Sequence, residues 1–291
     1  MENEFKFLMN GEMSQFMKEG QSFSFNEYFA LGREQAFAAS SPAKRAFLSL
    51  FGTLQINPRI RSGRILSEII KVDLPDDASI LDAGFGYGLT VFALSRKFEN
   101  WKIVGYELDE EFVNKALKIK NRAKTENVTL FQKNLNDMRD EKVFNLIYSC
   151  DVLEHIQEDV AVIHHFKQAL KPGGILILHL PLRYELSRRI FPWFKNYDTE
   201  DHVRDEYLPN EIRHKLETAG FHVDSIQYGY GLLKGELAFE LNNFVNANKI
   251  GLVLSQLITF PLSLLLGFWD IKHPPALGNS LVIKASLRGN K

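Results

Sequence analysis

The clearest candidate for binding chemistry is a glycine-rich loop between an apolar run and a helical run. In the segment Asp82-Ala83-Gly84-Phe85-Gly86-Tyr87-Gly88, three glycines stand at alternate positions. Glycines let a backbone approach a ligand closely because they carry no Cβ. A helix that begins at Leu89 would point its free N–H groups and its positive dipole end at the same ligand. Leucine at position 89 departs from the Gly-x-Gly-x-x-Gly of dinucleotide-binding folds, which disfavours a nicotinamide dinucleotide.

Polar residues also end the strands that we expect next, at 102–107, 128–133 and 144–149. Glu107 ends the first of them, where a carboxylate can accept hydrogen bonds from the hydroxyls of a ribose. Asn134 follows the second, and its side-chain amide can read the edge of an adenine ring. Because ligands of open α/β sheets bind at the carboxyl ends of the strands, we expect these groups to share one site.

Three histidines and two carboxylates are the candidates for acid–base chemistry. Asp151, Glu154 and His155 are spaced i, i+3 and i+4, which would place them on one helical face. They would deprotonate an acceptor or bind a divalent metal; alternatively, Glu154 and His155 only cap and orient the loop, and we favour a site without metal. His202 follows the fifth expected strand and titrates near neutral pH if unperturbed, so it is our first choice for a general base, with a structural loop contact as the alternative. His179 is expected to be a hydrogen-bonded core residue.

Short apolar runs alternate with helical runs through most of the chain. The expected strands are 79–84, 102–107, 128–133, 144–149, 175–180, 221–229 and 280–286. The segment Lys171-Pro172-Gly173-Gly174 is expected to form a turn before the fifth. Strands that alternate with helices predict a parallel sheet covered on both faces.

The chain ends differ from this pattern and suggest two added parts. Residues 1–70 are helical in pattern and rich in phenylalanine, and we expect a helical cap there. Residues 71–291 would form the main domain, with an apolar insertion at 245–275. Arg59, Arg61 and Arg64 are expected on the solvated surface, with contact to a ligand carboxylate as the alternative.

Composition excludes several classes of protein. The chain has 291 residues and 45% hydrophobic side chains, which is enough for a large core. Lys+Arg 35 against Asp+Glu 36 gives a net charge of −1, without the basic excess that favours nucleic-acid binding. The single cysteine excludes a disulfide within the chain and, with an N-terminus that lacks a signal-peptide pattern, favours the cytoplasm.

Four segments in order resemble one family. The runs ILDAGFGYG, VGYELD, LIYSCDVLEHI and LKPGGILILHLP are similar to those of class I S-adenosylmethionine-dependent methyltransferases, small-molecule branch. The resemblance covers roughly residues 78–230 and 280–286. It implies an α/β, Rossmann-like fold with seven strands in the order 3-2-1-4-5-7-6, the last of them antiparallel.

The resemblance also implies roles for individual residues. Gly84, Phe85, Gly86 and Gly88 would surround the methionine part of S-adenosylmethionine, with Asp82 orienting the loop. Glu107 would bind the ribose, and Leu108, Asn134 and Leu135 would border the adenine. Ser149 and Cys150 would present backbone groups to the methionine end. The catalytic candidates remain His202, Asp151 and His155.

The segment 250–269 contains no charged residue and is long enough to span a bilayer by the criterion of about 20 residues. Its topology argues against a span, because only ten residues separate it from the last expected strand. A buried lid, a homodimer contact or a helix lying in the membrane interface remain open.

These observations predict methyl transfer from S-adenosylmethionine to a small, lipophilic acceptor, with an oxygen as the expected methylated atom. A cytoplasmic protein, peripheral to the membrane in one version, is expected. The alternatives are a non-catalytic cofactor-binding assembly or regulatory subunit, a nicotinamide-dependent dehydrogenase and a nucleic-acid methyltransferase. The last is disfavoured because the fourth strand ends in Ser149-Cys150-Asp151-Val152, unlike the Asn-Pro-Pro-Tyr type of amino-methylating enzymes.

Overall fold

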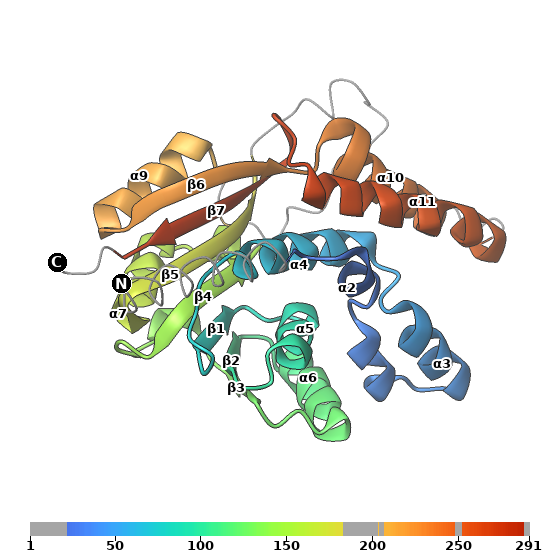
Figure 1. Cartoon of the computed structure of the whole chain (residues 1–291), viewed down its shortest axis with the longest axis horizontal. Helices are drawn as coiled ribbons and strands as arrows, with labels where there is room; N and C mark the ends of the chain where they lie inside the picture. Colours follow the sequence, from blue (N-terminus) through green and yellow to red (C-terminus); the bar gives the residue numbers. More distant parts are fainter. Residues whose placement is uncertain (1–21, 183–202, 204–206, 248–251, 288–291) are drawn as a thin grey trace, which may run out of the picture.

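A single seven-stranded sheet forms the centre of the molecule (Figure 1). The computed structural model describes residues 22–182, 203, 207–247 and 252–287, with the backbone alone at 244–247 and 252–258. The strands are β1 (Ser79–Ala83), β2 (Lys102–Glu107), β3 (Val128–Gln132), β4 (Phe144–Cys150), β5 (Leu170–Pro181), β6 (His222–Gly229) and β7 (Ser280–Ser286).

The strand order is β3-β2-β1-β4-β5-β7-β6, as expected. β7 pairs antiparallel with β5 and with β6, whereas the other neighbours are parallel. The predicted Rossmann-like α/β fold is therefore confirmed. The carboxyl ends of β1, β2 and β4 lie at one edge of the sheet, where the candidate residues gather.

Helices cover both faces of the sheet and form the parts that flank it. The helices are α2 (Phe25–Phe29), η1 (Arg33–Ala38), α3 (Pro42–Phe51), α4 (Ile56–Ile69), α5 (Leu89–Lys97), α6 (Glu110–Ala123), η2 (Leu135–Asp137), η3 (Leu153–His155), α7 (Asp159–Ala169), α9 (Pro209–Ala219), η4 (Leu232–Glu236), α10 (Leu237–Ala247) and α11 (Leu252–Lys272). Asp109 caps the start of α6: its side chain accepts hydrogen bonds from the backbone N–H groups of Glu111 and Phe112, which have no partner within the helix.

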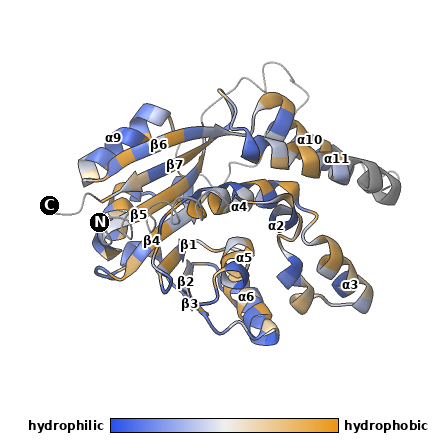
Figure 2. Ribbon diagram, viewed as in Figure 1, coloured by the Kyte–Doolittle hydropathy of each residue, from blue (hydrophilic) through white to orange (hydrophobic). Residues whose placement is uncertain are grey.

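Alternate strand residues supply two separate cores. In β5, Ile177 belongs to the core beneath α4 and α5, whereas Leu176 and Leu178 belong to the core beneath α7 and α9. Because strand side chains alternate between faces, a strand covered on both sides is apolar throughout. Figure 2 shows this as hydrophobic colouring along the central strands and hydrophilic colouring on much of α9.

The turn expected at 171–174, before the fifth strand, lies inside that strand instead. β5 begins at Leu170 and includes these residues, with a register shift against β4 between Phe144 and Leu146. Gly173 has a left-handed φ of 75°, so the chain bends inside the strand without ending it.

The helical segment before the sheet is tied together by an arginine that sequence placed on the surface. Arg59 is fully buried, and its guanidinium donates to the carbonyls of Tyr28 and Phe29 at the end of α2, of Phe51 at the end of α3, and of Thr53 two residues beyond it. Carbonyls at helix ends carry partial negative charge and therefore suit a buried cation. The boundary at residue 70 stays a prediction, because α4 contacts the sheet directly through β4, β5 and β7.

α10 and α11 follow β6 in the chain, pair with each other and pack on α4, and α11 makes up most of the apolar insertion expected at 245–275. Arg64, also expected on the surface, is buried and forms an ion pair with Asp270 of α11 at 2.5 Å. Asp270 also accepts from the backbone N–H groups of Tyr230 and Gly231. In the part of the chain that the structure describes, no helix combines the length and hydropathy needed to cross a membrane.

Candidate functional site

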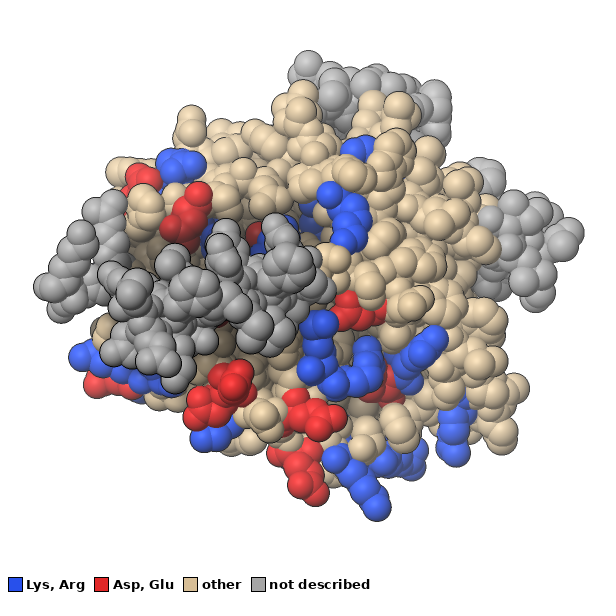
Figure 3. Space-filling view, viewed as in Figure 1, with Lys and Arg blue, Asp and Glu red and all other residues tan. Residues whose placement is uncertain are grey.

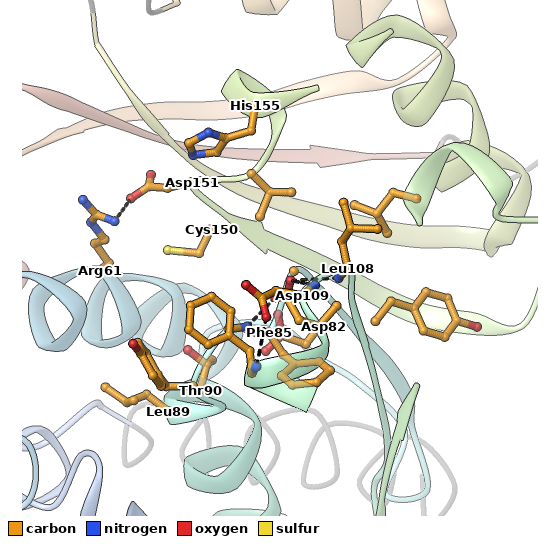
Figure 4. Close-up of a pocket in the computed structure, with 18 of the residues that line it drawn as sticks. Arg61, Asp82, Phe85, Leu89, Thr90, Leu108, Asp109, Cys150, Asp151 and His155 are labelled. Carbon is orange, nitrogen blue, oxygen red and sulfur yellow. Dashed lines mark hydrogen bonds and ion pairs between the residues drawn. The ribbon is translucent and has the colours of Figure 1, made fainter. Parts of the chain in front are cut away.

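A cavity of about 750 Å³ opens at the carboxyl ends of β1, β2 and β4 and is closed on one side by α4 (Figure 4). Most of the residues predicted from sequence line it: Asp82, Gly84, Phe85, Gly86, Glu107, Leu108, Asn134, Leu135, Cys150, Asp151 and His155. Gly88 caps α5 instead, and Ser149 is buried with its hydroxyl donating to the Ala83 carbonyl at 2.7 Å. His202 lies outside the described residues.

Two glycines of the loop, Gly84 and Gly86, both have a left-handed φ but differ in their surroundings. Gly84 has a φ of 90°, and a Cβ there would lie 2.2 Å from a methyl group of Val152. Gly86 has a φ of 50°, and a Cβ there would meet no atom within 4 Å, so its backbone faces open space in the cavity. The loop therefore leaves room for a ligand beside Gly86.

Glu107 anchors this loop as well as ending β2. Its Oε2 accepts from the Gly86 N–H at 2.8 Å, and its Oε1 accepts from the N–H groups of Leu108 at 2.8 Å and Asp109 at 3.0 Å. These bonds fix the carboxylate at the cavity wall, and Oε2 retains a lone pair for a ligand hydroxyl. The sequence indicated the position of Glu107 but not its bond to the glycine loop.

Asp82 lies behind the loop in a dry environment. Burial, with repulsion from Glu107, raises the pKa of Asp82 to about 8, although a hydrogen bond from the Tyr148 hydroxyl opposes the rise. That bond is 2.7 Å long and is made to Oδ2. Asp82 therefore takes up a proton more readily than an ordinary aspartate. The loop-orienting role expected for Asp82 stays a prediction, because the hydrogen bond to its Oδ2 comes from Tyr148 on β4 and not from the glycine loop.

Asn134 and Leu135 border the cavity next to Leu108. The Asn134 Oδ1 accepts from the Asn136 N–H at 3.0 Å and caps the short helix η2. This bond occupies the amide oxygen, so the amide nitrogen would face an adenine edge. The adenine-binding role remains a prediction.

The helical face expected for Asp151, Glu154 and His155 is wrong. Asp151 lies in a bend after β4 with a left-handed φ of 51°, and residues 153–155 form a single 3₁₀ turn. The i, i+3, i+4 spacing places side chains on one face only in a continuous α-helix. Glu154 is therefore buried, whereas His155 is exposed and lines the cavity.

Asp151 is held by residues from two other elements. Its Oδ2 pairs with the Arg61 guanidinium of α4 at 2.7 Å, and its Oδ1 lies 2.6 Å from Nδ1 of His179 on β5. Burial works to raise the pKa of Asp151, but the charge of Arg61 and the contact with His179 outweigh it and hold that pKa below its ordinary value. His179 is thus buried, as expected, but its Nε2 has no hydrogen-bond partner among the described residues.

Arg61 lines the cavity, although the solvated surface was the first expectation for it and contact with a ligand only the alternative. Pro58, Arg61 and Ser62 all line the cavity from α4. Their i, i+3, i+4 spacing on an expected helix was the available signal. The Arg61 Nε donates to the Asn57 side chain at 3.0 Å, and Asn57 also accepts from the Tyr230 hydroxyl.

The cysteine and a possible metal cluster lie at the same wall. Cys150, Asp151 and His179 bring their ligand atoms within 4.8 Å of one another, and no other described cluster does so. Asp151 already bonds Arg61 and His179, and burial, with the nearby Asp151 charge, raises the pKa of the Cys150 thiol. A thiol kept protonated is a poor nucleophile.

Residues 81–176 match the family model of a methyltransferase domain. Trans-aconitate 2-methyltransferase of Pseudomonas paraeruginosa is 26% identical over 123 residues, which cover 42% of this chain and 43% of that protein. The chain spans about half the length of the curated relatives it matches.

Solved structures share the fold at low identity. Phosphoethanolamine N-methyltransferase 2 of Haemonchus contortus, in complex with S-adenosyl-L-methionine, superposes with a TM-score of 0.56 at 16% identity over 78% of this chain and 52% of that one. The [4+2]-cyclase SpnF gives 0.56 at 14% identity over 78% and 82%. One fold thus serves more than one chemistry, and the site must decide the activity.

The domain match, the strand order with an antiparallel β7 and the glycine loop beside Glu107 agree with one another. Residues 81–176 therefore match a methyltransferase domain, and they lie in a fold that a methyltransferase solved with bound S-adenosyl-L-methionine shares.

Proposed function

We propose that this chain transfers the methyl group of S-adenosylmethionine to an oxygen atom of a small acceptor with an apolar body. The observation that carries the proposal is the continuity of the cavity. The glycine loop and Glu107 line one part of it, and Arg61, Cys150, Asp151 and His155 line another. Its volume of about 750 Å³ lies within the range of ligand pockets, about 300–1,000 Å³.

The residues present fit the cofactor at the loop end. Gly86 leaves open space, Glu107 faces that space with a partly free oxygen, and Leu108 and Leu135 offer apolar surface. S-adenosylmethionine supplies a methyl group that is already activated as a sulfonium. The protein then has to align the acceptor and exclude water, which are the usual sources of rate enhancement for a displacement.

The acceptor end combines apolar and ionic groups. Val152 and Ile156 add to the apolar lining near His155. A hydroxyl acceptor would lose its proton to a base there, and His155 is the described histidine that lines the cavity. The relatives named as trans-aconitate 2-methyltransferases make trans-aconitate one reasonable acceptor to test.

Turnover tests this proposal directly. Calorimetry should show binding of S-adenosylmethionine, and incubation with a panel of phenols, alcohols, carboxylic acids and trans-aconitate should release S-adenosylhomocysteine. Binding without turnover across the panel would instead favour the cofactor-binding subunit. A protein that does not bind the cofactor would contradict the whole assignment.

We further propose that the exposed side of α11 contacts an anionic membrane, which would supply a lipophilic acceptor. Leu262, Leu265 and Trp269 are exposed at i, i+3 and i+7. The three described acids of this region, Glu236, Glu240 and Asp270, are buried, and Lys234 lies over the Trp269 ring at 4.7 Å. Figure 3 shows no acidic side chain over the described part of α10 and α11 on this face. Apolar residues with tryptophan and lysine at the margin suit an anionic lipid surface.

Flotation with vesicles of phosphatidylcholine and phosphatidylglycerol tests this contact. Leu262→Glu should reduce vesicle binding several-fold, whereas Leu208→Glu should not, because Leu208 is equally exposed (44% against 46%) but lies at the start of α9. If Leu262→Glu instead changes a dimer to a monomer by light scattering, a second copy of the chain covers this face. Equal flotation of the two variants would also exclude the membrane version.

A further inference from the structure

We propose that the methylated oxygen belongs to a carboxylate and that Arg61 binds this carboxylate. The inference rests on the proposed methyl transfer and narrows its acceptor to carboxylic acids, with a methyl ester as the product. Arg61 lines the cavity, and its side chain is 36% exposed. Figure 4 shows it beside Asp151, across the cavity from the glycine loop.

The guanidinium is fixed in position yet retains donors. Nε bonds Asn57 at 3.0 Å, Nη1 pairs with Asp151 at 2.7 Å, and the Tyr230 hydroxyl is a third hydrogen-bond partner. A guanidinium has five N–H donors in a planar fork, so three bonds leave others for a ligand. A planar fork matches a carboxylate in geometry, and a guanidinium stays charged at any working pH.

Asp151 is placed to hold Arg61 and poorly placed to act as a base. Both of its oxygens are engaged, by Arg61 and by His179. The groups that face it are Arg61 from α4, His179 from β5, His155 from η3 and the neighbouring Cys150, and the three basic groups lower its pKa. A carboxylate stabilised in this way accepts protons weakly near neutral pH.

His179 in turn holds Asp151. Its carbonyl accepts from the Asp151 N–H at 2.9 Å, in addition to the side-chain contact at 2.6 Å. A left-handed φ is uncommon for aspartate and costs energy unless the surroundings fix it. His179 and Asp151 are therefore positioning residues, which set the place of the guanidinium.

A carboxylate acceptor requires no base, because carboxyl groups are ionised at neutral pH. A lone pair of the carboxylate oxygen forms the new O–CH₃ bond while the S–CH₃ bond breaks. The electron pair of that bond stays on sulfur, so a methyl ester and a neutral thioether form and no proton moves. One positive and one negative charge disappear together, which a cavity with apolar walls favours.

The experiment compares acids with alcohols on the full-length chain. Octanoic, palmitic and benzoic acids are each paired with the corresponding alcohol, and products are treated with alkali, which releases methanol from methyl esters but not from ethers. We expect methyl esters from the acids, no ethers, and a kcat/KM that stays flat between pH 6 and 9. Ethers from the alcohols, with a rate that rises with pH, would overturn the proposal.

Variants separate this role from cofactor binding. Arg61→Met should lower kcat/KM for the acid at least 100-fold while the Kd for S-adenosylmethionine changes less than threefold, and Arg213→Met, on the exposed side of α9, should change neither. Arg61→Lys keeps the charge and provides the comparison if Arg61→Met does not fold. An equal loss of cofactor affinity would show that Arg61 binds the cofactor and not the acceptor.

The failure of this inference differs from failure of the proposed function. If the wild-type chain binds the cofactor but methylates none of the acids, the carboxylate assignment is wrong while the cofactor site stands. If it does not bind S-adenosylmethionine, the methyl-transfer proposal itself is wrong.

Discussion

Two aspartates at the ends of the neighbouring strands β1 and β4 have opposite electrostatic surroundings. Asp82 has the Tyr148 hydroxyl as its partner and Glu107 nearby, and its pKa is raised to about 8. Asp151 has Arg61 and His179, and its pKa is lowered. Burial works in the same direction at both positions, so the difference comes from the partners. One end of the cavity thus holds an acid that is hard to ionise, and the other holds an ion pair.

The two ends also differ in how the chain builds them. The carboxylate of Glu107 bonds the backbone of Gly86, Leu108 and Asp109, all within 21 residues. The carboxylate of Asp151 instead bonds side chains from α4 and β5. The proposed cofactor end is therefore a product of one βαβ segment, and the proposed acceptor end depends on how distant segments meet.

The largest expected effect concerns Asp82 and pH. The pKa of Asp82 is higher in the folded chain than in the unfolded one, so the folded chain binds its proton more tightly. The resulting contribution to the free energy of unfolding is fully present below pH 4 and is lost as pH rises toward about 8. Relative to Asp82→Asn, the wild-type free energy of unfolding should fall by up to about 1.4 kcal/mol per pH unit in this window. Urea denaturation at pH 5, 6, 7 and 8 measures it, with the exposed Asp77→Asn as control. Parallel curves for wild type and Asp82→Asn would remove the contrast between the two aspartates.

A smaller effect, of the opposite sign, is expected at Asp151. Asp151→Asn should lower the free energy of unfolding at pH 7 by about 1–3 kcal/mol, less than for a fully buried pair because Arg61 is partly exposed. The lowered pKa means that this contribution is present above pH 4 and is lost as pH falls below it. The cost of the substitution should therefore shrink at pH 3 in the same denaturation experiment. A cost as large at pH 3 as at pH 7 would contradict the ion pair.

The smallest expected effect is on cofactor affinity at Glu107, and it tests whether the glycine-loop end of the cavity binds the cofactor. Glu107→Gln removes the charge of the carboxylate and should raise the Kd for S-adenosylmethionine about tenfold, or about 1.4 kcal/mol. Glu111→Gln, an exposed change on the adjacent helix α6, is the matched control. Calorimetry measures both, and unchanged affinity in a folded Glu107→Gln protein would count against ribose binding by Glu107.

Sequence patterns were most informative where structure depends on near neighbours. The seven strands, the glycine loop and the helix start at Asp109 follow from apolar spacing, glycine placement and capping residues. Patterns misled where a bend interrupts the spacing. The left-handed Asp151 breaks the helical face expected there, and Gly173 bends β5 inside the strand instead of ending it.

The arginines show the limit of the sequence. Arg59, Arg61 and Arg64 lie within two turns of one helix and resemble solvated residues, yet the first binds carbonyls, the second faces the cavity and the third pairs with Asp270. Each arginine has a partner that is distant in the chain: Tyr28 is 31 residues from Arg59, Asp151 comes from another element than Arg61, and Asp270 is 206 residues from Arg64.

By itself, the sequence determined the sheet, its glycine loop and the match to a methyltransferase domain, because these depend on the chemistry of contiguous residues. Only the tertiary structure decided which charges meet at the acceptor end. An ion pair between Arg61 and Asp151 requires α4 to lie beside the end of β4, and no local pattern in either segment specifies that contact.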